Sequence, residues 1–403
     1  MKKSVFKVAG RLAVILVVMM MCMASVTAEA STKKSVKVSK KGYEAAEPFY
    51  KDIILVKQGG KWGMATLSGK QLVSCQFAEV YSDDKIVCFL KKVKRGEDGS
   101  FLYAQGCYIY NSKGKLLYSL KENNKDGLLI GEVAISKGVV LIKAGTEKNW
   151  WGSVYTNKYY TVTTDKSGDK VKKTEWNENP GGGALRVASG IANGKVIVMK
   201  EDICYYHNGK KLKNLQIENE TYSYNTDKYI FSHFYYATEP SREDPDHYYV
   251  YNIKTQKSYL IDTVTSGYPF HGMAGNNVVI SNEDHSLYGL YTIKGKKITK
   301  KVYSYLECTD DVKQYYLVCK NGKYFYIDKN GKEYGKQYKD VGKFVDGKAI
   351  VLDKNGKAFI IDEKFRQISE SVKADSVATL RKNSFCYGKN GKQYALTING
   401  GNQ

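Results

Sequence analysis

Short apolar runs separated by glycine-centred turns fill most of the chain, and three copies of one pattern lie near its C-terminal end. Each copy opens with Lys-Asn-Gly-Lys and continues into an apolar or aromatic run: Lys320–Asp328, Lys354–Asp362 and Lys389–Thr397. Their starts are 34 and 35 residues apart. Asn-Gly favours the tight type I′ turn of a β-hairpin, because both central residues of that turn need positive φ. The pattern therefore predicts hairpins that recur at a regular interval.

The same pattern extends backwards over most of the sequence. Matching turns are expected 34 to 51 residues apart, near Gly60, Gly106, Asn157, Asp202, Asp246, Ser286, Gly322, Gly356 and Gly391. Each unit reads as three or four antiparallel strands, and no stretch combines a helical period with capping residues. Such units are typical of propeller blades, which bury their faces only when neighbours stack. The predicted fold is all-β: a β-propeller of short antiparallel blades, with eight as the best count in a range of seven to nine. An open array of the same units is the alternative.

The segment before the first hairpin resembles the missing part of a unit. Ser35–Ser39 and Tyr43–Phe49 read as a third and a fourth strand with no hairpin before them, while the last unit stops early. Closing a ring would protect the strand edges that an open array exposes. We therefore predict a basic N-terminal segment at residues 31–42 that closes the ring, followed by the propeller domain at residues 43–403.

The first 30 residues have the order of a secretory signal peptide. Lys2, Lys3, Lys7 and Arg11 precede an apolar run from Leu12 to Met23, and Ala28-Glu29-Ala30 supplies small residues for cleavage after Ala30. No later segment is apolar for about 18 residues, so no transmembrane segment is expected after cleavage. The expected location is extracellular, either secreted or noncovalently associated with the cell surface.

Charge and cysteine content narrow the expected partners and sites. The formal charge is +22, and a large excess of one sign attracts polyanions over long range. Outside a cell this favours acidic wall polymers, anionic headgroups or glycans, and makes nucleic acid an unlikely partner; the alternative is that the lysines serve solubility alone. The cysteines are scattered and form no Cys-x-x-Cys pair. Their spacing indicates neither a disulfide framework nor a zinc site.

One unit resembles a known repeat family. Residues Ile53–Lys70 contain an apolar strand, then Lys61-Trp62-Gly63, a second strand and a Gly-Lys turn, and this order is similar to that of the tryptophan-glycine (WG) β-repeat family. Tyr288-Gly289 looks like a degenerate copy. Elsewhere the Trp-Gly pair is replaced, so one unit carries the signature and a looser pattern covers most of residues 43–398. The resemblance implies a repetitive β-fold and no particular activity.

Acidic and histidine residues show no organised catalytic or metal-binding spacing. Carboxylates for a glycosidase or lyase at the propeller channel could come from Asp202, Asp262, Asp328 and Asp362, although Asp328 and Asp362 occupy equivalent repeat positions and read first as turn residues. The acidic stretch Glu239–His247 lacks the Asp-x-Asp-x-Asp-Gly order of a calcium loop. We expect no metal, no cofactor and no catalytic residues.

Aromatic residues offer the best candidate binding site. Trp150, Trp151, Tyr155 and Tyr159 could form a platform on which sugar rings stack, because flat rings combine apolar area with polar edges. The alternative is that they fill an interface between blades. The interpretation is a monomeric, non-catalytic binding or scaffold module for a cell-wall polymer, another glycan or a protein partner. The two other hypotheses are a carbohydrate-active enzyme and a purely structural repeat array.

Overall fold

The computed structural model contains antiparallel β-sheets throughout its described part. It describes residues 33–83, 85–154, 158–165, 167–177, 186–192, 194–200, 203–206, 211–216, 229–234, 246–252, 254–264, 270–274, 277–282, 284–292, 294, 296–307, 315–381 and 384–398. Within these residues every regular element is a β-strand, which confirms the all-β prediction. The expected signal peptide lies outside the described residues.

Most of the sheets are simple meanders of sequential strands. The first contains β2 (Ala45–Tyr50), β3 (Ile53–Gln58), β4 (Lys61–Thr66) and β5 (Gln71–Phe77). Two more have four strands: β14 (Arg186–Ala192), β15 (Lys195–Lys200), β16 (Ile203–Tyr206) and β17 (Lys211–Gln216); and β24 (Tyr305–Glu307), β25 (Tyr315–Lys320), β26 (Lys323–Asp328) and β27 (Glu333–Tyr338). Two have three strands: β18 (Tyr229–Phe234), β19 (Asp246–Asn252) and β20 (Lys257–Val264); and β21 (Phe270–Ala274), β22 (Asn277–Ser281) and β23 (Tyr288–Thr292). Another has β28 (Asp340–Val341), β29 (Lys348–Leu352), β30 (Lys357–Asp362) and β31 (Val372–Lys373).

One sheet is larger because it combines two meanders. It contains β6 (Glu79–Ser82), β7 (Ile86–Arg95), β8 (Phe101–Asn111) and β9 (Leu116–Leu120), then β10 (Leu129–Ser136), β11 (Val139–Gly145), β12 (Lys158–Thr164) and β13 (Val171–Asn177). The long strand β8 pairs with β9 through its second half, and Ala104 in its first half lies opposite Ile130 of β10. The described chain therefore has eight sheets and nine meanders, which confirms the predicted range.

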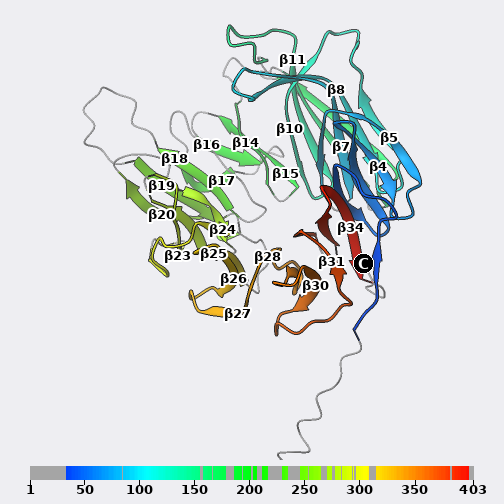
Figure 1. Ribbon diagram of the computed structural model, residues 1–403. Coiled ribbons are helices and arrows are strands. Elements are labelled where there is room, and N and C mark those ends of the chain that lie inside the picture. Colours follow the sequence, from blue (N-terminus) through cyan, green and yellow to red (C-terminus); the bar gives the residue numbers. More distant parts are fainter. Residues whose placement is uncertain are drawn as a thin grey trace, which may run out of the picture.

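The two ends of the chain meet in the last sheet. Its order is β1 (Val36–Val38), β34 (Lys392–Ile398), β33 (Ser384–Lys389) and β32 (Ser376–Arg381). Val36 lies opposite Ile398 and Val38 opposite Leu396. The prediction that Tyr43–Phe49 is the fourth strand of this unit is wrong: β1 is the fourth strand, and most of Tyr43–Phe49 belongs to β2, which opens the first sheet. Figure 1 shows the red strand β34 beside the blue N-terminal strands.

Neighbouring sheets bury each other's faces. In β3 the consecutive residues Ile54, Leu55 and Val56 are all buried, although alternation alone predicts that one face is exposed. Ile54 and Val56 pack towards Ala395 of the last sheet, whereas Leu55 packs towards Phe89 of the eight-stranded sheet. A strand covered on both faces is expected to be apolar at every position. The first sheet is therefore packed between the last sheet and the eight-stranded sheet, as a propeller blade is packed between its neighbours.

The Trp-Gly signature has a steric reason in the first sheet. A Cβ added to Gly63 would lie 2.6 Å from the carbonyl oxygen of Val73 and 2.8 Å from the amide nitrogen of Cys75. Residue 63 lies where the pairing of β4 with β5 shifts register, so the backbone of β5 approaches it closely. In the degenerate copy, a Cβ on Gly289 would lie 3.1 Å from the carbonyl oxygen of Lys300. At both positions glycine allows close approach of a neighbouring backbone, and the approach is closer at Gly63.

Two predicted hairpin turns are misplaced. Gly106 lies inside β8, because the hairpin β7–β8 is longer than the repeat pattern suggests and turns at residues 96–100. Asp246 is the first residue of β19, and the following turn falls after Asn252. The turns predicted near Gly60, Ser286, Gly322, Gly356 and Gly391 join the expected strands. Asn157 and Asp202 lie outside the described residues.

Candidate functional site

Two adjacent tryptophans form the most exposed large apolar feature of the described chain. The side chains of Trp150 and Trp151 are 86% and 68% exposed, whereas no other large hydrophobic residue in the described part exceeds 45%. Their ring centroids are 4.2 Å apart with an interplanar angle of 38°. We call these two residues the tryptophan pair. They lie in the connection between β11 and β12.

A capped turn holds the tryptophan pair in solvent. The backbone N–H of Gly152 donates to the carbonyl oxygen of Asn149 at 2.9 Å, and the N–H of Ser153 donates to Asn149 Oδ1, also at 2.9 Å. Gly152 has φ of +85°, a conformation that residues with a Cβ rarely adopt. An asparagine side chain that accepts backbone N–H groups in this way forms an Asx-type turn. The geometry fixes both ends of the turn and directs its two central residues outward.

The same turn recurs elsewhere in the protein without tryptophan. At Asp353 the carboxylate accepts the N–H groups of Asn355 and Lys357, both at 2.9 Å, and Gly356 has φ of +72°. There the two central residues are Lys354 and Asn355. The tryptophan pair therefore occupies positions that a repeat turn normally fills with polar side chains, and this explains its exposure.

The base of this turn rests on the long hairpin. Lys148 Nζ lies 3.1 Å from the Tyr103 hydroxyl oxygen and 4.3 Å from the centroid of the same ring. A Cβ at Gly152 would be 3.6 Å from Leu102 Cδ1. Tyr103 and Leu102 both belong to β8, and Lys148 forms an antiparallel bridge with Val154. The site thus combines two bare indole rings with an exposed ammonium group on a supported turn.

The four predicted platform residues are not all brought together. Trp150 and Trp151 lie side by side, Tyr155 lies outside the described residues, and Tyr159 is only 3% exposed. Tyr159 and Tyr160 are consecutive residues of β12 and both are buried, because both faces of this strand are covered. Tyr159 therefore presents no ring face to a ligand. The alternative that Trp151 fills an interface between sheets does not fit its exposure.

A polar cluster on the eight-stranded sheet is centred on Glu122. The Tyr108 hydroxyl donates to Glu122 Oε2, and Lys91 Nζ lies 2.9 Å from Glu122 Oε1. The hydrogen bond from Tyr108, followed by the contact with Lys91, lowers the pKa of Glu122 to about 2. These contacts use every member of the cluster to join β7, β8 and the loop after β9, so its geometry indicates a structural role.

Two of the four candidate acids are fixed at turns. Asp328 Oδ1 accepts the N–H groups of Asn330 and Lys332, and Asp362 Oδ1 accepts those of Lys364 and Arg366. Asp362 Oδ2 also lies 2.7 Å from Arg366 Nη2. Asp202 and the side chain of Asp262 lie outside the described part, as does most of Glu239–His247. Among the described residues no group of three or more His, Cys, Asp or Glu side chains could hold a metal ion.

Comparisons with known proteins agree with the repeat assignment. The family described as "WG containing repeat" matches residues 36–62, which confirms the resemblance inferred from the Trp-Gly unit. No curated protein sequence matches the chain. None of the described residues forms a helix that could span a bilayer.

Solved structures with a similar course of the chain include designed and natural proteins. The computationally designed Ika8 protein is 13% identical, with a TM-score of 0.40, over 91% of this chain and 99% of its own. BamB from Moraxella catarrhalis is 9% identical, with a TM-score of 0.34, over the same two shares. The C-terminal WD40 domain of Sif2 is 8% identical, with a TM-score of 0.36, over 79% of this chain and 93% of its own.

Proposed function

We propose that this protein is an exported, non-catalytic binding module that engages an anionic glycan of the cell surface through the tryptophan pair. The observation that carries the proposal is the exposure of two adjacent indole rings on a turn whose backbone is fixed. Adjoining exposed apolar side chains mark interaction sites more than single ones do, and aromatic rings combine apolar area with polar edges that suit sugars.

The area of the tryptophan pair is large enough for a specific contact. A fully covered aromatic side chain buries about 150–250 Å². Covering half of that area on both rings would contribute roughly 5 kcal/mol at about 25 cal/mol per Å², before the costs of association. The fixed turn reduces one of those costs, because its backbone is already ordered. A loss of about tenfold or more in affinity is therefore expected when both rings are removed.

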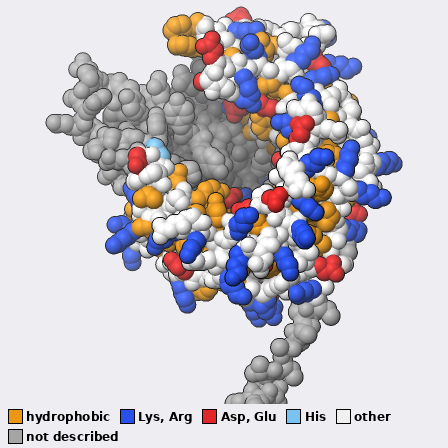
Figure 2. All heavy atoms as spheres, viewed as in Figure 1, with side chains coloured by type: hydrophobic (Ala, Val, Ile, Leu, Met, Phe, Trp, Pro, Cys, Tyr) orange, Lys and Arg blue, Asp and Glu red, His pale blue; other side chains and the backbone are white. Residues whose placement is uncertain are grey.

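Charge supports an anionic glycan over a neutral one. The chain has 63 lysine and arginine residues against 41 acids, and basic side chains are spread over the face in Figure 2. Lys148 places one such charge at the base of the turn that bears the tryptophan pair. Long-range attraction would bring the polymer to the surface, and stacking would hold a sugar ring locally.

The test is co-sedimentation with purified insoluble cell-wall glycan, before and after chemical removal of its anionic groups. The protein should bind the intact glycan, and added salt should weaken binding because the Debye length falls to about 3 Å at 1 M. The double variant Trp150→Ala/Trp151→Ala should bind at least about tenfold more weakly. Tyr305→Ala is the matched control, because Tyr305 is another exposed aromatic residue, 42% exposed, on a different sheet.

Two results would contradict this function. Binding that is the same in the double variant and in the wild type would remove the tryptophan pair from the site. Binding to vesicles of anionic phospholipid, with none to the glycan, would instead assign the rings to a membrane interface, where tryptophan and lysine also gather. Export is tested separately by N-terminal sequencing of protein recovered from the medium or the cell surface, which should start at Ser31.

A further inference from the structure

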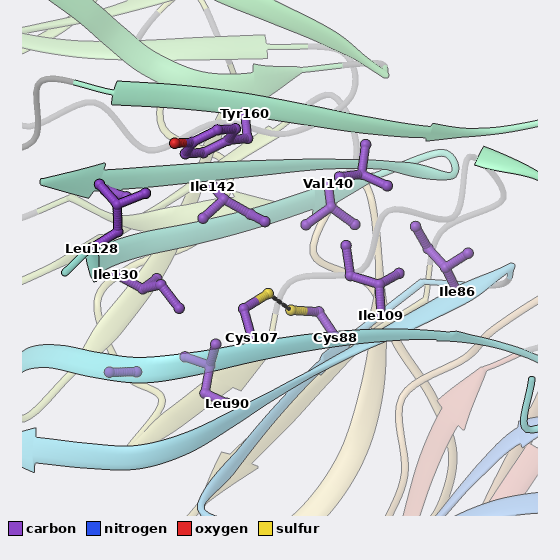
Figure 3. Close-up of a cluster of buried hydrophobic side chains, with 13 residues drawn as sticks. Ile86, Cys88, Leu90, Cys107, Ile109, Leu128, Ile130, Val140, Ile142 and Tyr160 are labelled. Carbon is purple, nitrogen blue, oxygen red and sulfur yellow. Dashed lines mark hydrogen bonds between the residues drawn. The ribbon is translucent and has the colours of Figure 1, made fainter. Parts of the chain in front are cut away.

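Two cysteines face each other inside the eight-stranded sheet. Cys88 Sγ and Cys107 Sγ are 3.2 Å apart, and both residues are completely buried. Figure 3 shows the two sulfur atoms pointing towards one another from adjacent strands. The other cysteines on described strands, Cys75, Cys204, Cys319 and Cys386, lie in four other sheets.

The strand register explains why these two thiols meet. Cys88 of β7 lies opposite Ile109 of β8, and Leu90 lies opposite Cys107. The cysteines are therefore diagonal neighbours on one face of an antiparallel pair, close enough for side chains to touch. A disulfide has an S–S length of about 2.05 Å, so the sulfur atoms need to approach by only about 1.1 Å.

The surroundings favour a bond that forms early and then persists. The pair belongs to an apolar cluster that includes Ile109, Ile130 and Ile142. The hydrogen bond with Cys107 and then burial raise the pKa of the Cys88 thiol well above its ordinary value. Thiol–disulfide exchange requires a thiolate that can reach its target. Both conditions are met while β7 and β8 are still accessible and not after the sheet has packed.

We propose that Cys88 and Cys107 form a disulfide as the chain folds in an oxidising compartment, and that this bond crosslinks the two strands of the hairpin β7–β8. One cysteine thiolate attacks an exchangeable disulfide, of a small thiol or of a thiol oxidoreductase, and releases one thiolate. The second cysteine then attacks the mixed disulfide and releases the other. The two cysteines lose two protons and two electrons, and the donor disulfide is reduced to two thiols.

The disulfide would stabilise the hairpin on which the turn with the tryptophan pair rests. Because Tyr103 of β8 contacts Lys148 at the base of that turn, fixing β8 to β7 limits movement beneath it. The proposal does not depend on glycan binding, since it concerns the covalent state of the chain. Its failure would leave the proposed function untouched.

The first test is mass spectrometry of the full chain refolded in a mixture of reduced and oxidised glutathione. The protein is denatured without reductant, alkylated and digested. We expect one linked peptide pair joining Cys88 to Cys107, lighter by two hydrogen atoms than the separate peptides. The control variant Cys386→Ala, which removes another buried cysteine, should retain this link. Complete alkylation of both Cys88 and Cys107 would overturn the proposal, as would a link between other cysteines in its place.

The second test separates the bond from the packing of the side chains. Wild-type protein that is refolded and heated in reductant should have a thermal midpoint about 5 °C below that of protein refolded in the glutathione mixture and heated without reductant, because the bond restricts the unfolded chain. In the double variant Cys88→Val/Cys107→Ala the midpoint should be the same under these two conditions, whatever its value. A wild-type midpoint that is also the same under the two conditions would contradict a stabilising disulfide. If the double variant does not fold, the wild-type comparison decides alone.

Discussion

Substitution of Gly63 by alanine tests the physical basis of the Trp-Gly repeat. An added Cβ would lie 2.6 Å from the Val73 carbonyl oxygen and 2.8 Å from both the Ser74 carbonyl carbon and the Cys75 amide nitrogen. All three atoms are backbone, so no side-chain rotation can relieve the contact. Restoring ordinary contact would require β5 to move by about 0.6–0.8 Å, within a packed core that resists such shifts.

The expected loss of stability follows from two opposing contributions. Overpacking of a core costs about 1–3 kcal/mol. Replacing glycine by alanine in a strand recovers about 0.5–1 kcal/mol of conformational entropy. We therefore expect Gly63→Ala to lower the free energy of unfolding by about 1–2 kcal/mol. Urea unfolding followed by far-UV circular dichroism measures this difference.

Two other glycines make the comparison quantitative. A Cβ on Gly289 would meet the Lys300 carbonyl oxygen at 3.1 Å, whereas the nearest atoms to one on Gly106 belong to the side chains of Glu122 and Tyr108, both at 3.1 Å. Side-chain ends can move away more easily than backbone. The loss should therefore decrease in the order Gly63, Gly289, Gly106. If Gly63→Ala is as stable as Gly106→Ala, close approach of the backbone is not the reason for this glycine.

Three further substitutions test the junction of the N- and C-terminal strands, the stability at low pH and the turn that bears the tryptophan pair. Ser39→Ala should lower the free energy of unfolding by about 1–2 kcal/mol in the same urea assay, because the buried N–H of Ala395 donates to Ser39 Oγ at 3.2 Å and would lose that acceptor. The hydrogen bond from Tyr108 lowers the pKa of Glu122, so the stability that the Glu122 carboxylate contributes is present above pH 4.5 and is lost as the pH falls towards 2. The thermal midpoint of Glu122→Gln should therefore fall less than that of the wild type between pH 4.5 and about 2. If the thermal midpoints of the two proteins fall equally over this pH range, Glu122 does not make that contribution. Asn149→Ala should weaken glycan binding several-fold with little change in the thermal midpoint, because it frees the turn and leaves both indole rings in place; unchanged co-sedimentation would show that the turn need not be fixed.

Much of the fold could be predicted from the sequence because its turns carry their own signals. Asn-Gly at residues 321–322 and 390–391 specifies hairpins locally, and the structure has them there. The sequence predicts a lengthened hairpin in the polar stretch Lys91–Ser100 but places its turn near Gly106, because residues 96–100 contain no Asn-Gly and the repeat interval points to Gly106. Repetition predicts that units are equivalent, and it cannot predict where one unit is extended.

The candidate site was only partly predictable, because exposure depends on which faces other sheets cover. Tyr159 and Trp151 are both aromatic residues in the same connection and strand region, yet Tyr159 is buried and Trp151 is exposed. The usable signal was the spacing Asn149-x-x-Gly152, which matches the capped repeat turn at Asp353. The Cys88–Cys107 contact could not be predicted without the strand register, because the pairing of Leu90 with Cys107 is what brings the sulfur atoms together.

A crosslink between the two ends of the chain tests the central claim most directly, namely that the N-terminal strand completes the sheet of the C-terminal strands. Val36 and Ile398 lie directly opposite each other, at a separation that antiparallel partners share with disulfides, about 4.5–5.5 Å between Cα atoms. The double variant Val36→Cys/Ile398→Cys should form this bond on air oxidation, and a linked peptide should join residue 36 to residue 398. Recovery of both introduced thiols in free form from folded protein would show that the two ends do not share a sheet.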